Sequence, residues 1–264
     1  MRTRWMLVGL SLCVFLAGCG TLRSIGGGST NTIRVGTSGT YPPFSNADNG
    51  RLEGIEVDFA RALANEIGSA VEVVQVPFPD LVGELTAGRI DIIMAGMSIT
   101  PRRAELVNFT APYLHVGQMA LVRREDDLRL AGQDWTRIEG LRVGFERATT
   151  GAKYVQAELL RAVPVEFASK EDGLAALKHR KIDVFVHDAP FVWLVVGSPH
   201  DPNAELAGRF TPLTDEKLAW AVRKGDGELL DQLNSVVARW RENGTIDSVL
   251  DKWIRVRKVT LPIP

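Results

Sequence analysis

The sequence is poor in the residue types that mark metal sites, disulfide frameworks and thiol enzymes. Its 264 residues include 2 cysteines and 4 histidines, and no histidines have the close pairing of a zinc site. The formal net charge is −1, and no run of Lys and Arg is long enough to mark a nucleic-acid-binding surface. A Ser-His-Asp signature is also lacking. We therefore expect a packed globular protein with no metal, no cofactor and no nucleic-acid partner.

The amino terminus lacks an apolar run long enough to span a bilayer and instead predicts an export signal. Arg2 and Arg4 precede an apolar stretch from Trp5 to Ala17, well short of the ~20 residues that a membrane-spanning helix needs. A basic start, a short apolar segment and small residues at its end are typical of a secretory signal. The alternative is a short membrane-anchoring helix.

The end of that signal, Leu16-Ala17-Gly18-Cys19, resembles a bacterial lipobox, in which the chain is cut before the cysteine and its sulfur is acylated. The resemblance implies a signal peptide over 1–18 and a lipid on Cys19 that anchors the protein to the outer face of a bacterial membrane. Cys13 leaves with the signal, so neither a disulfide nor a thiol nucleophile remains. Residues 19–31, rich in Gly and Ser, are predicted to be a flexible tether.

Two parts of the chain repeat one pattern in the same order. A predicted strand at 33–36 is followed by the segment 85–96, and a second one at 141–144 is followed by 177–188. In each later segment a leucine is separated by four residues from an Ile-Asp pair, and a short apolar run follows. Such a run is typical of a strand buried on both faces of a parallel sheet. The repetition predicts two lobes of similar build.

Amphipathic helices separate the predicted strands. Apolar residues recur at helical spacing from Ile55 to Ile67, and Gly68 follows as a typical residue beyond a helix end. A second apolar stripe, from Leu229 to Trp240, precedes Gly244. Strands that alternate with helices predict an α/β fold in which each lobe has a mostly parallel sheet flanked by helices. The segment 217–224 is predicted to be one further strand.

The polar clusters that follow the predicted strands come from both lobes. They lie at 37–41, 95–98, 146–150 and 187–188. Ligands of such sheets bind beyond the carboxyl ends of the strands, so a cleft between the two lobes is the expected site.

Several short motifs follow one another along the chain. They are VGTSGTYPPF at 35–44, GIEVD at 54–58, AGMSITPRR at 95–103, FTAPY at 109–113, AVRKG at 221–225 and ENGT at 242–245. Their order and spacing resemble the bacterial polar-amino-acid-binding proteins of ABC importers, solute-binding protein family 3. The resemblance covers about Thr32 to Trp253. It implies the type II periplasmic binding protein fold, with hinge strands near Tyr113–Gln118 and Leu213–Leu218.

The same resemblance sets the expected boundaries and function. Lobe 1 comprises 32–115 and 216–256, lobe 2 comprises 116–215, and 257–264 form a C-terminal tail. The chain is expected to be a monomer that captures an amino acid or a related small zwitterion by lobe closure and delivers it to the permease of an ABC transporter.

Arg103 is the first candidate for ligand binding. Thr100 and Pro101 are typical of an N-cap and a first helical position, so Arg103 falls in a first turn, where the helix dipole disfavours a cation. A negative partner is therefore expected, and a guanidinium matches a carboxylate with two hydrogen bonds. The resemblance implies that Arg103 holds the ligand α-carboxylate and that the turn with Ala95, Gly96 and Ser98 adds donors. The alternative is a surface arginine, which is the interpretation we adopt for Arg102.

Asp188 ends a buried strand, where an unpaired carboxylate is costly. The resemblance implies that Asp188 holds the ligand ammonium, and an N-cap role for the helix that follows is the alternative. His187 beside it is expected to form a cleft wall or to contact the ligand side chain.

The remaining candidates line the walls of the expected cleft. Tyr41 and Phe78 resemble the two aromatic walls of the family, although Phe78 fits a core position equally well. Thr149 and Thr150 lie where a helix begins, and they either cap that helix or direct hydroxyls and amides at an anion.

Two positions depart from the family pattern. Ser38 stands where relatives often have an acidic residue, which removes a second carboxylate from the ammonium. Glu146 stands where relatives often have an apolar or basic residue. If Glu146 reaches the cleft, a cationic or hydroxyl-bearing ligand side chain is expected, and a solvated loop acid is the alternative.

Two other functions remain open on the sequence. Some relatives of this fold are cyclohexadienyl dehydratases, which place a glutamate three residues beyond the aspartate as a general acid. Phe191 occupies that position here and has no proton to give, so binding without catalysis is favoured. A ligand sensor is the third possibility, and it would require a separate signalling partner.

Overall fold

The computed structural model describes residues 32–131, 134–196, 205–209 and 211–254. The predicted signal peptide at 1–18, the predicted lipidation site Cys19, the predicted tether at 19–31 and the predicted tail at 257–264 lie outside the described residues. None of the helices in the described ranges is long and apolar enough to cross a bilayer.

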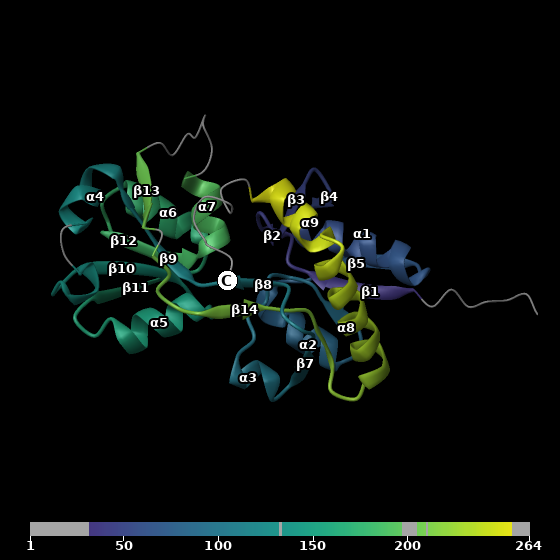
Figure 1. The fold of residues 1–264 in the computed structure, drawn as a ribbon. Helices are drawn as coiled ribbons and strands as arrows, with labels where there is room; N and C mark the ends of the chain where they lie inside the picture. The colour runs from purple at the N-terminus through teal and green to yellow at the C-terminus, as the bar shows by residue number, and fades with distance from the viewer. Residues whose placement is uncertain (1–31, 132–133, 197–204, 210, 255–264) are drawn as a thin grey trace, which may run out of the picture. The chain divides into compact units, whose positions relative to one another are not determined.

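The first lobe is built on a five-stranded mixed sheet (Figure 1). Its strands, in spatial order, are β5 (Val71–Gln75), β1 (Ile33–Thr37), β6 (Ile92–Ile93), β15 (Ala221–Arg223) and β7 (Val107–Phe109). Both neighbours of β1 are parallel to it, whereas β15 is antiparallel to β6 and to β7. Four strands therefore share one direction, and only β15 is reversed.

The second lobe repeats this arrangement. Its strands, in spatial order, are β11 (Val163–Phe167), β10 (Arg142–Glu146), β12 (Val184–Asp188), β9 (Gln118–Arg123) and β13 (Leu206–Arg209). Here β9 is the reversed strand. The structure thus confirms two lobes of similar build, each with a mostly parallel sheet in which one strand runs against the others.

The repeated Ile-Asp motif makes the same contact in both lobes. Arg34 donates from Nε and Nη2 to the carboxylate of Asp91 at 3.0 and 2.9 Å, and its backbone N–H reaches the same carboxylate at 3.0 Å. Arg142 makes the three corresponding bonds to Asp183 at 3.0, 2.8 and 3.0 Å. The aspartate fastens the start of its own strand to the neighbouring one.

The reversed strand of each lobe adds a second arginine to this contact. Arg223 of β15 lies 3.2 Å from the Asp91 carboxylate and donates to the carbonyl of Ile90 at 2.7 Å. Arg123 of β9 lies 3.5 Å from the Asp183 carboxylate and donates to the carbonyl of Ile182 at 2.6 Å. The correspondence between the lobes therefore extends to strands whose sequences do not match.

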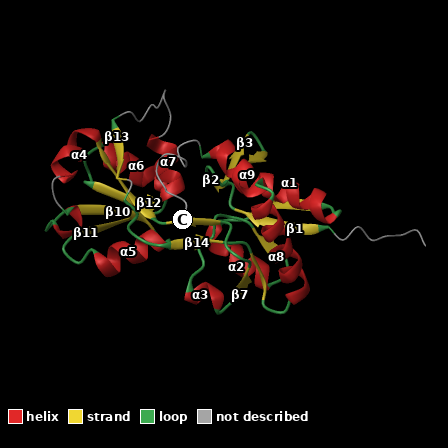
Figure 2. Ribbon diagram, in the orientation of Figure 1, coloured by secondary structure: helices red, strands yellow, loops and turns green. Residues whose placement is uncertain are grey.

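Helices cover both faces of each sheet (Figure 2). Alternate strand residues point to different apolar clusters. In the first lobe, α1 (Ile55–Ile67), α8 (Gly227–Glu242) and α9 (Thr245–Trp253) pack on one face, and α2 (Leu81–Thr86) packs on the other. Gly68 ends α1 with a φ of 63°, as its place in the sequence predicts.

In the second lobe, α6 (Lys170–Lys178) and α7 (Ala189–Val196) share one face of the sheet. The other face carries α5 (Thr150–Glu158) and the end of α4 (Arg124–Ala131), with the short 3-10 helix η2 (Trp135–Arg137) beside them.

Shorter elements complete the first lobe. They are β2 (Thr40–Tyr41), β3 (Ser45–Asp48) and β4 (Arg51–Glu53), which form a small antiparallel sheet, the 3-10 helix η1 (Phe78–Asp80) and the short helix α3 (Pro101–Ala104).

Two antiparallel strands connect the lobes. They are β8 (Leu114–Val116) and β14 (Glu216–Leu218), and both fall within the segments expected for hinges. Gly117 follows β8, and a Cβ added there would lie 2.0 Å from the backbone oxygen of Thr214. Only a glycine lets the two connecting segments approach this closely.

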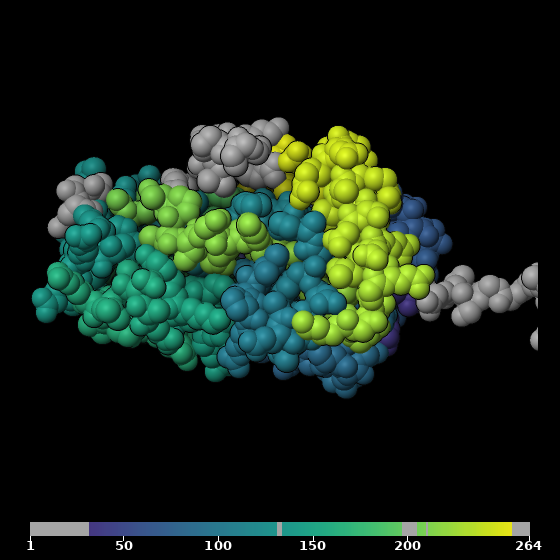
Figure 3. All heavy atoms as spheres, turned by 60° about the horizontal axis from the view of Figure 1, so that its bottom comes forward, coloured from purple at the N-terminus to yellow at the C-terminus, as the bar shows by residue number. Residues whose placement is uncertain are grey.

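The final part of the chain returns to the first lobe. The yellow atoms of α8 and α9 gather beside the blue atoms of that lobe (Figure 3), and α9 contacts α1. The prediction of a single strand over 217–224 is wrong. The structure has two strands there, because β14 pairs with β8, whereas β15 enters the sheet between β6 and β7.

Candidate functional site

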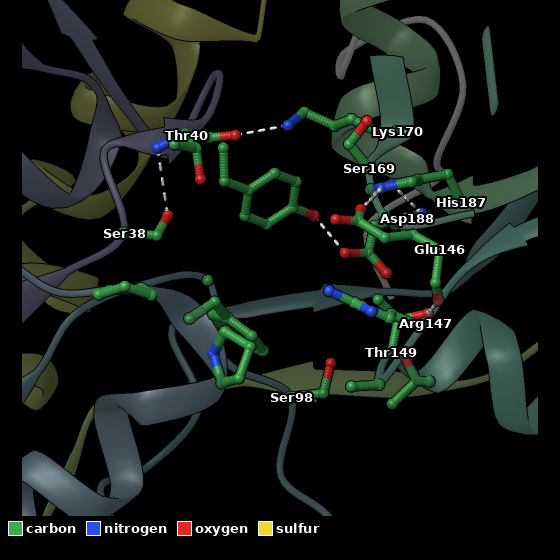
Figure 4. A pocket seen from close by; sticks show the side chains of 18 of the residues that line it. Ser38, Thr40, Ser98, Glu146, Arg147, Thr149, Ser169, Lys170, His187 and Asp188 are labelled. Atoms are coloured by element: carbon green, nitrogen blue, oxygen red, sulfur yellow. Dashed lines mark hydrogen bonds and ion pairs between the residues drawn. The ribbon is translucent and has the colours of Figure 1, made fainter. Parts of the chain in front are cut away.

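A cavity of about 680 Å³ is lined by residues of both lobes (Figure 4). All of the predicted ligand-binding residues except Ala95 line it, namely Ser38, Tyr41, Phe78, Gly96, Ser98, Arg103, Glu146, Thr149, Thr150, His187 and Asp188. Ala95 does not line the cavity, because its side chain is 2% exposed and packs in the apolar cluster under α2; the donor role of its backbone stays a prediction.

The strands deliver these residues as the sheet topology predicts. Ser38 follows β1, Gly96 follows β6, Glu146 ends β10 and Asp188 ends β12. The carboxyl ends of the parallel strands of both lobes therefore face one cavity.

Arg103 enters the cavity from α3. The Thr100 hydroxyl accepts from the backbone N–H of Arg103 at 3.3 Å, and Pro101 occupies the first turn, so the predicted cap is confirmed. Its guanidinium Nη1 donates to the Ser98 carbonyl at 2.9 Å, and the guanidinium carbon Cζ lies 5.3 Å from the centroid of the Phe78 ring.

The charge of Arg103 has no close counterion among the described residues. Burial lowers the pKa of Arg103, while the carboxylates of Asp188 and Glu216 act at longer range to raise it. Among the described residues, no carboxylate forms an ion pair with this guanidinium, whose remaining donors can take an anion in the cavity. Arg102 is exposed and does not line the cavity.

Asp188 faces Arg103 from the opposite lobe. Its carboxylate accepts hydrogen bonds from the Tyr41 hydroxyl and from Nε2 of Gln118. Burial first, and then the charge of Asp188, raise the pKa of Tyr41 well above its usual value, so the tyrosine is the donor. These contacts direct the carboxylate into the cleft.

The aromatic walls are partly core. The Tyr41 ring packs on Phe44 at a centroid distance of 5.0 Å and lies 5.9 Å from the His187 ring. Phe78 lines the cavity and also packs against the apolar cluster under α2. Both interpretations of Phe78 therefore hold.

The two threonines at the start of α5 have different contacts. The Thr149 hydroxyl accepts from the Ala152 backbone N–H at 3.1 Å and donates to the Glu146 carbonyl at 2.7 Å, so Thr149 is an N-cap. The Thr150 hydroxyl oxygen lies 3.0 Å from Gln118 Nε2, whose two protons are directed at Asp188 and Glu216.

Glu146 reaches the cavity and pairs with His187. The backbone N–H of Asp188 donates to Nδ1 of His187 at 2.8 Å, so that nitrogen carries no proton in the neutral ring. The proton is then on Nε2, which donates to Glu146 at 3.1 Å. His187 holds one oxygen of Glu146 and leaves the other for a ligand donor.

Ser38 is occupied by its own lobe. Its hydroxyl lies 3.3 Å from the Ser45 hydroxyl, and its carbonyl accepts from Gln75 at 3.3 Å. No carboxylate replaces it among the residues that line this part of the cavity in the described chain, where Gln75 and Thr40 are the neighbours.

Lys170 is a cavity residue that the sequence did not reveal. Its side chain is 6% exposed, its ammonium lies 3.0 Å from Glu171, and it donates to the Thr40 carbonyl of the other lobe. Tyr41–Asp188 and Lys170–Thr40 thus both bridge the lobes. No motif marks Lys170, since its partner is a backbone carbonyl far away in the sequence.

The position of the dehydratase acid has no proton donor. Phe191 is 5% exposed, its ring lies 4.4 Å from that of His187, and it does not line the cavity. In the described ranges, no three His, Cys, Asp or Glu side chains gather in a way that would hold a metal.

Known proteins share this architecture. Residues 33–256 match the family model of the bacterial extracellular solute-binding proteins, family 3. An L-arginine-binding protein of Pseudomonas aeruginosa is 30% identical over 230 residues, which cover 84% of this chain and 87% of that protein.

Two solved structures are similar over the same region. A Wolinella succinogenes protein complexed with lysine has a TM-score of 0.79 at 27% identity, covering 84% of this chain and 95% of that one. An ancestral amino-acid-binding protein, described as a precursor of cyclohexadienyl dehydratase, has a TM-score of 0.75 at 31% identity, with the same coverage of 84% and 95%.

Proposed function

The chain belongs to the bacterial extracellular solute-binding proteins, family 3, and we propose from this premise that it captures an amino acid for the permease of an ABC importer. The observation that carries the proposal is the pair of opposite charges in one cavity. Arg103 of the first lobe has no ion-pair partner among the described carboxylates, and Asp188 of the second lobe ends a strand at the same cavity. An α-carboxylate and an α-ammonium match these two groups.

We further propose that the ligand side chain is cationic. The free oxygen of Glu146 offers an acceptor inside the cavity, where a second carboxylate of a ligand would be repelled. Relatives whose names state arginine binding, and a neighbour complexed with lysine, support the same class. L-Arginine and L-lysine are the first candidates.

Binding is proposed to proceed by closure of the lobes about β8 and β14, with the boundaries at 115/116 and 215/216. A ligand held by Arg103 on one side and Asp188 on the other binds fully only when the lobes are closed, so it shifts the population to that state. A single Arg–carboxylate pair contributes about 1.5–3 kcal/mol, whereas micromolar affinity requires about 8 kcal/mol. The aromatic walls, Glu146 and the backbone amides supply the rest.

The test is a thermal-shift screen against the twenty amino acids, followed by calorimetry on those that stabilise the protein. We expect L-arginine or L-lysine to give the largest shift. Arg103→Ala should weaken binding by at least about tenfold, because one charge-assisted pair is lost, and Arg102→Ala is the matched control with no effect. Equal effects of the two substitutions would contradict the assignment.

Binding without catalysis is part of the proposal. Phe191 leaves the position of the dehydratase acid without a proton. Incubation of the purified protein with prephenate should yield no phenylpyruvate, and a detectable amount would show that the chain is an enzyme.

We also propose that Cys19 carries a lipid that anchors a monomer outside the cytoplasmic membrane. The support is the lipobox resemblance of residues 16–19. Cys19→Ala should move the protein from the membrane fraction to the soluble fraction, and an unchanged distribution would refute the anchor.

A further inference from the structure

Below the cavity, a row of hydrogen bonds runs through both connections between the lobes. The Ser98 hydroxyl donates to Glu216 at 2.6 Å, and Nε2 of Gln118 donates to the other oxygen of Glu216 at 3.0 Å. The same Nε2 donates to Asp188. Gln118 is the first residue of β9 and Glu216 is the first residue of β14, so the row joins both hinge segments to both lobes.

The amide of Gln118 is oriented by two carboxylates. Gln118 is 1% exposed, and its Oε1 is buried with no hydrogen-bond partner among the described atoms. Rotation of the amide by half a turn would point this oxygen at both carboxylates, which would repel it. The NH₂ group therefore lies between Asp188 and Glu216, while Oε1 accepts no hydrogen bond from the described residues. A buried amide oxygen without a donor is unusual for a glutamine with a purely structural role.

The row brings two carboxylates close together. Asp188 and Glu216 share the NH₂ group of Gln118, and both act on the charge of Arg103. The other partners of Glu216 in the row are the neutral hydroxyls of Ser98 and Thr214, at 2.6 and 2.8 Å. No cation of the described residues forms an ion pair with Asp188 or Glu216, so their negative potential reaches the place where a ligand ammonium is proposed to lie.

We propose that Gln118 and Glu216 are positioning residues for the ligand ammonium, with Glu216 supplying from below the second negative charge that Ser38 lacks. Gln118 holds the Asp188 carboxylate toward the cavity, and Glu216 fixes Gln118 and the Ser98 hydroxyl. Neither residue lines the cavity, so each acts through Asp188 and through the local potential. The inference rests on the proposed function, because it requires a ligand with an α-ammonium.

The test compares two probes that differ only in the α-amino group. L-Arginine has the ammonium, and 5-guanidinopentanoic acid lacks it while keeping the carboxylate and the guanidinium. Their dissociation constants are measured by calorimetry or by competition for the wild type, for Glu216→Gln and for Gln118→Met. Glu72→Gln, at an exposed site on β5, is the matched control for loss of one negative charge.

We expect Glu216→Gln and Gln118→Met each to weaken L-arginine by about tenfold and 5-guanidinopentanoic acid by less than about twofold, because only the first probe presents a charge to the row. The control should change neither. Equal weakening of both probes would indicate a structural role and overturn the inference, as would an unchanged affinity for L-arginine. If one variant does not fold, the other gives the same comparison.

Failure of the proposed function gives a different result. A wild type that binds neither L-arginine nor L-lysine refutes the proposed ligand class, and the comparison is then made with the amino acid that binds in the screen and its des-amino counterpart. A wild type that binds none of the twenty amino acids overturns both proposals.

Discussion

Glu56, in the first turn of α1, is a buried carboxylate without a cationic partner in its hydrogen-bonded surroundings. It is 1% exposed and accepts from the Gly96 backbone N–H at 2.7 Å, the Tyr113 hydroxyl at 2.6 Å and Nε1 of Trp220 at 3.1 Å. Burial raises the pKa of Glu56 from 4.5 to about 7, and the three donors lower it by less than burial raises it. The charge of this residue therefore depends on pH near neutrality.

The sign of the effect on stability follows from the proton balance. Between pH 4.5 and about 7 the folded state keeps the Glu56 proton, whereas the unfolded state has lost it. The free energy of unfolding therefore falls as pH rises, by about 1.4 kcal/mol per pH unit, and the total is about 3 kcal/mol. Above pH 7 both states are ionised and the contribution is constant.

The assay is urea unfolding of the wild type and of Glu56→Gln between pH 4.5 and pH 8, followed by tryptophan fluorescence. Glutamine cannot ionise, and the other titrating groups cancel in the difference between the two proteins. The free energy of unfolding of the wild type minus that of the variant should decline by about 3 kcal/mol from pH 4.5 to pH 8. The variant also turns an NH₂ group toward Trp220 Nε1–H, which is a constant offset, so the slope is the diagnostic quantity.

Tyr113→Phe provides a second variant with a predicted direction. The Tyr113 hydroxyl is one of the donors that lower the pKa of Glu56, so its removal should extend the decline to higher pH. Parallel pH curves for the wild type and Glu56→Gln would refute the reasoning, because they would show that Glu56 binds a proton equally in both states.

Three further substitutions test the packing described above. Asp91→Ala and Asp183→Ala should lower the free energy of unfolding by similar amounts, about 1–2 kcal/mol each, because they remove matching contacts that solvent partly screens; chemical denaturation measures both. Gly117→Ala should destabilise the fold by about 1–3 kcal/mol in thermal unfolding, since its Cβ would lie 2.0 Å from the Thr214 oxygen. Thr149→Ala should cost about 1 kcal/mol in the same assay through loss of the N-cap.

Local patterns account for most of what could be predicted from the sequence. The helical stripe from Ile55 to Ile67, the cap at Thr100 and the strand ends at Glu146 and Asp188 depend on neighbouring residues, and the structure has them in place. The pattern did not show which residues of the turn after β6 line the cavity: Gly96 does, whereas the side chain of Ala95 packs in the core.

Contacts between distant segments could not be predicted. Gln118 and Glu216 meet because β9 and β14 are brought together by the crossing of the chain between the lobes, and nothing in their own neighbourhood marks them. Lys170 is unmarked for the same reason, since its acceptor is the backbone carbonyl of Thr40. The break between β14 and β15 likewise reflects two different pairing partners.

The position of β15 has a consequence for the order in which the chain folds. This strand, at Ala221–Arg223, lies between β6 and β7, which precede it by more than a hundred residues. Until it is made, those two strands have no common neighbour and leave unpaired backbone edges. The sheet of the second lobe, by contrast, is complete once Arg209 is available. During synthesis from the amino terminus, the second lobe is therefore expected to complete its sheet before the first lobe does. A truncation just before β15 should leave the sheet of the first lobe incomplete, although most of that lobe is synthesised earliest.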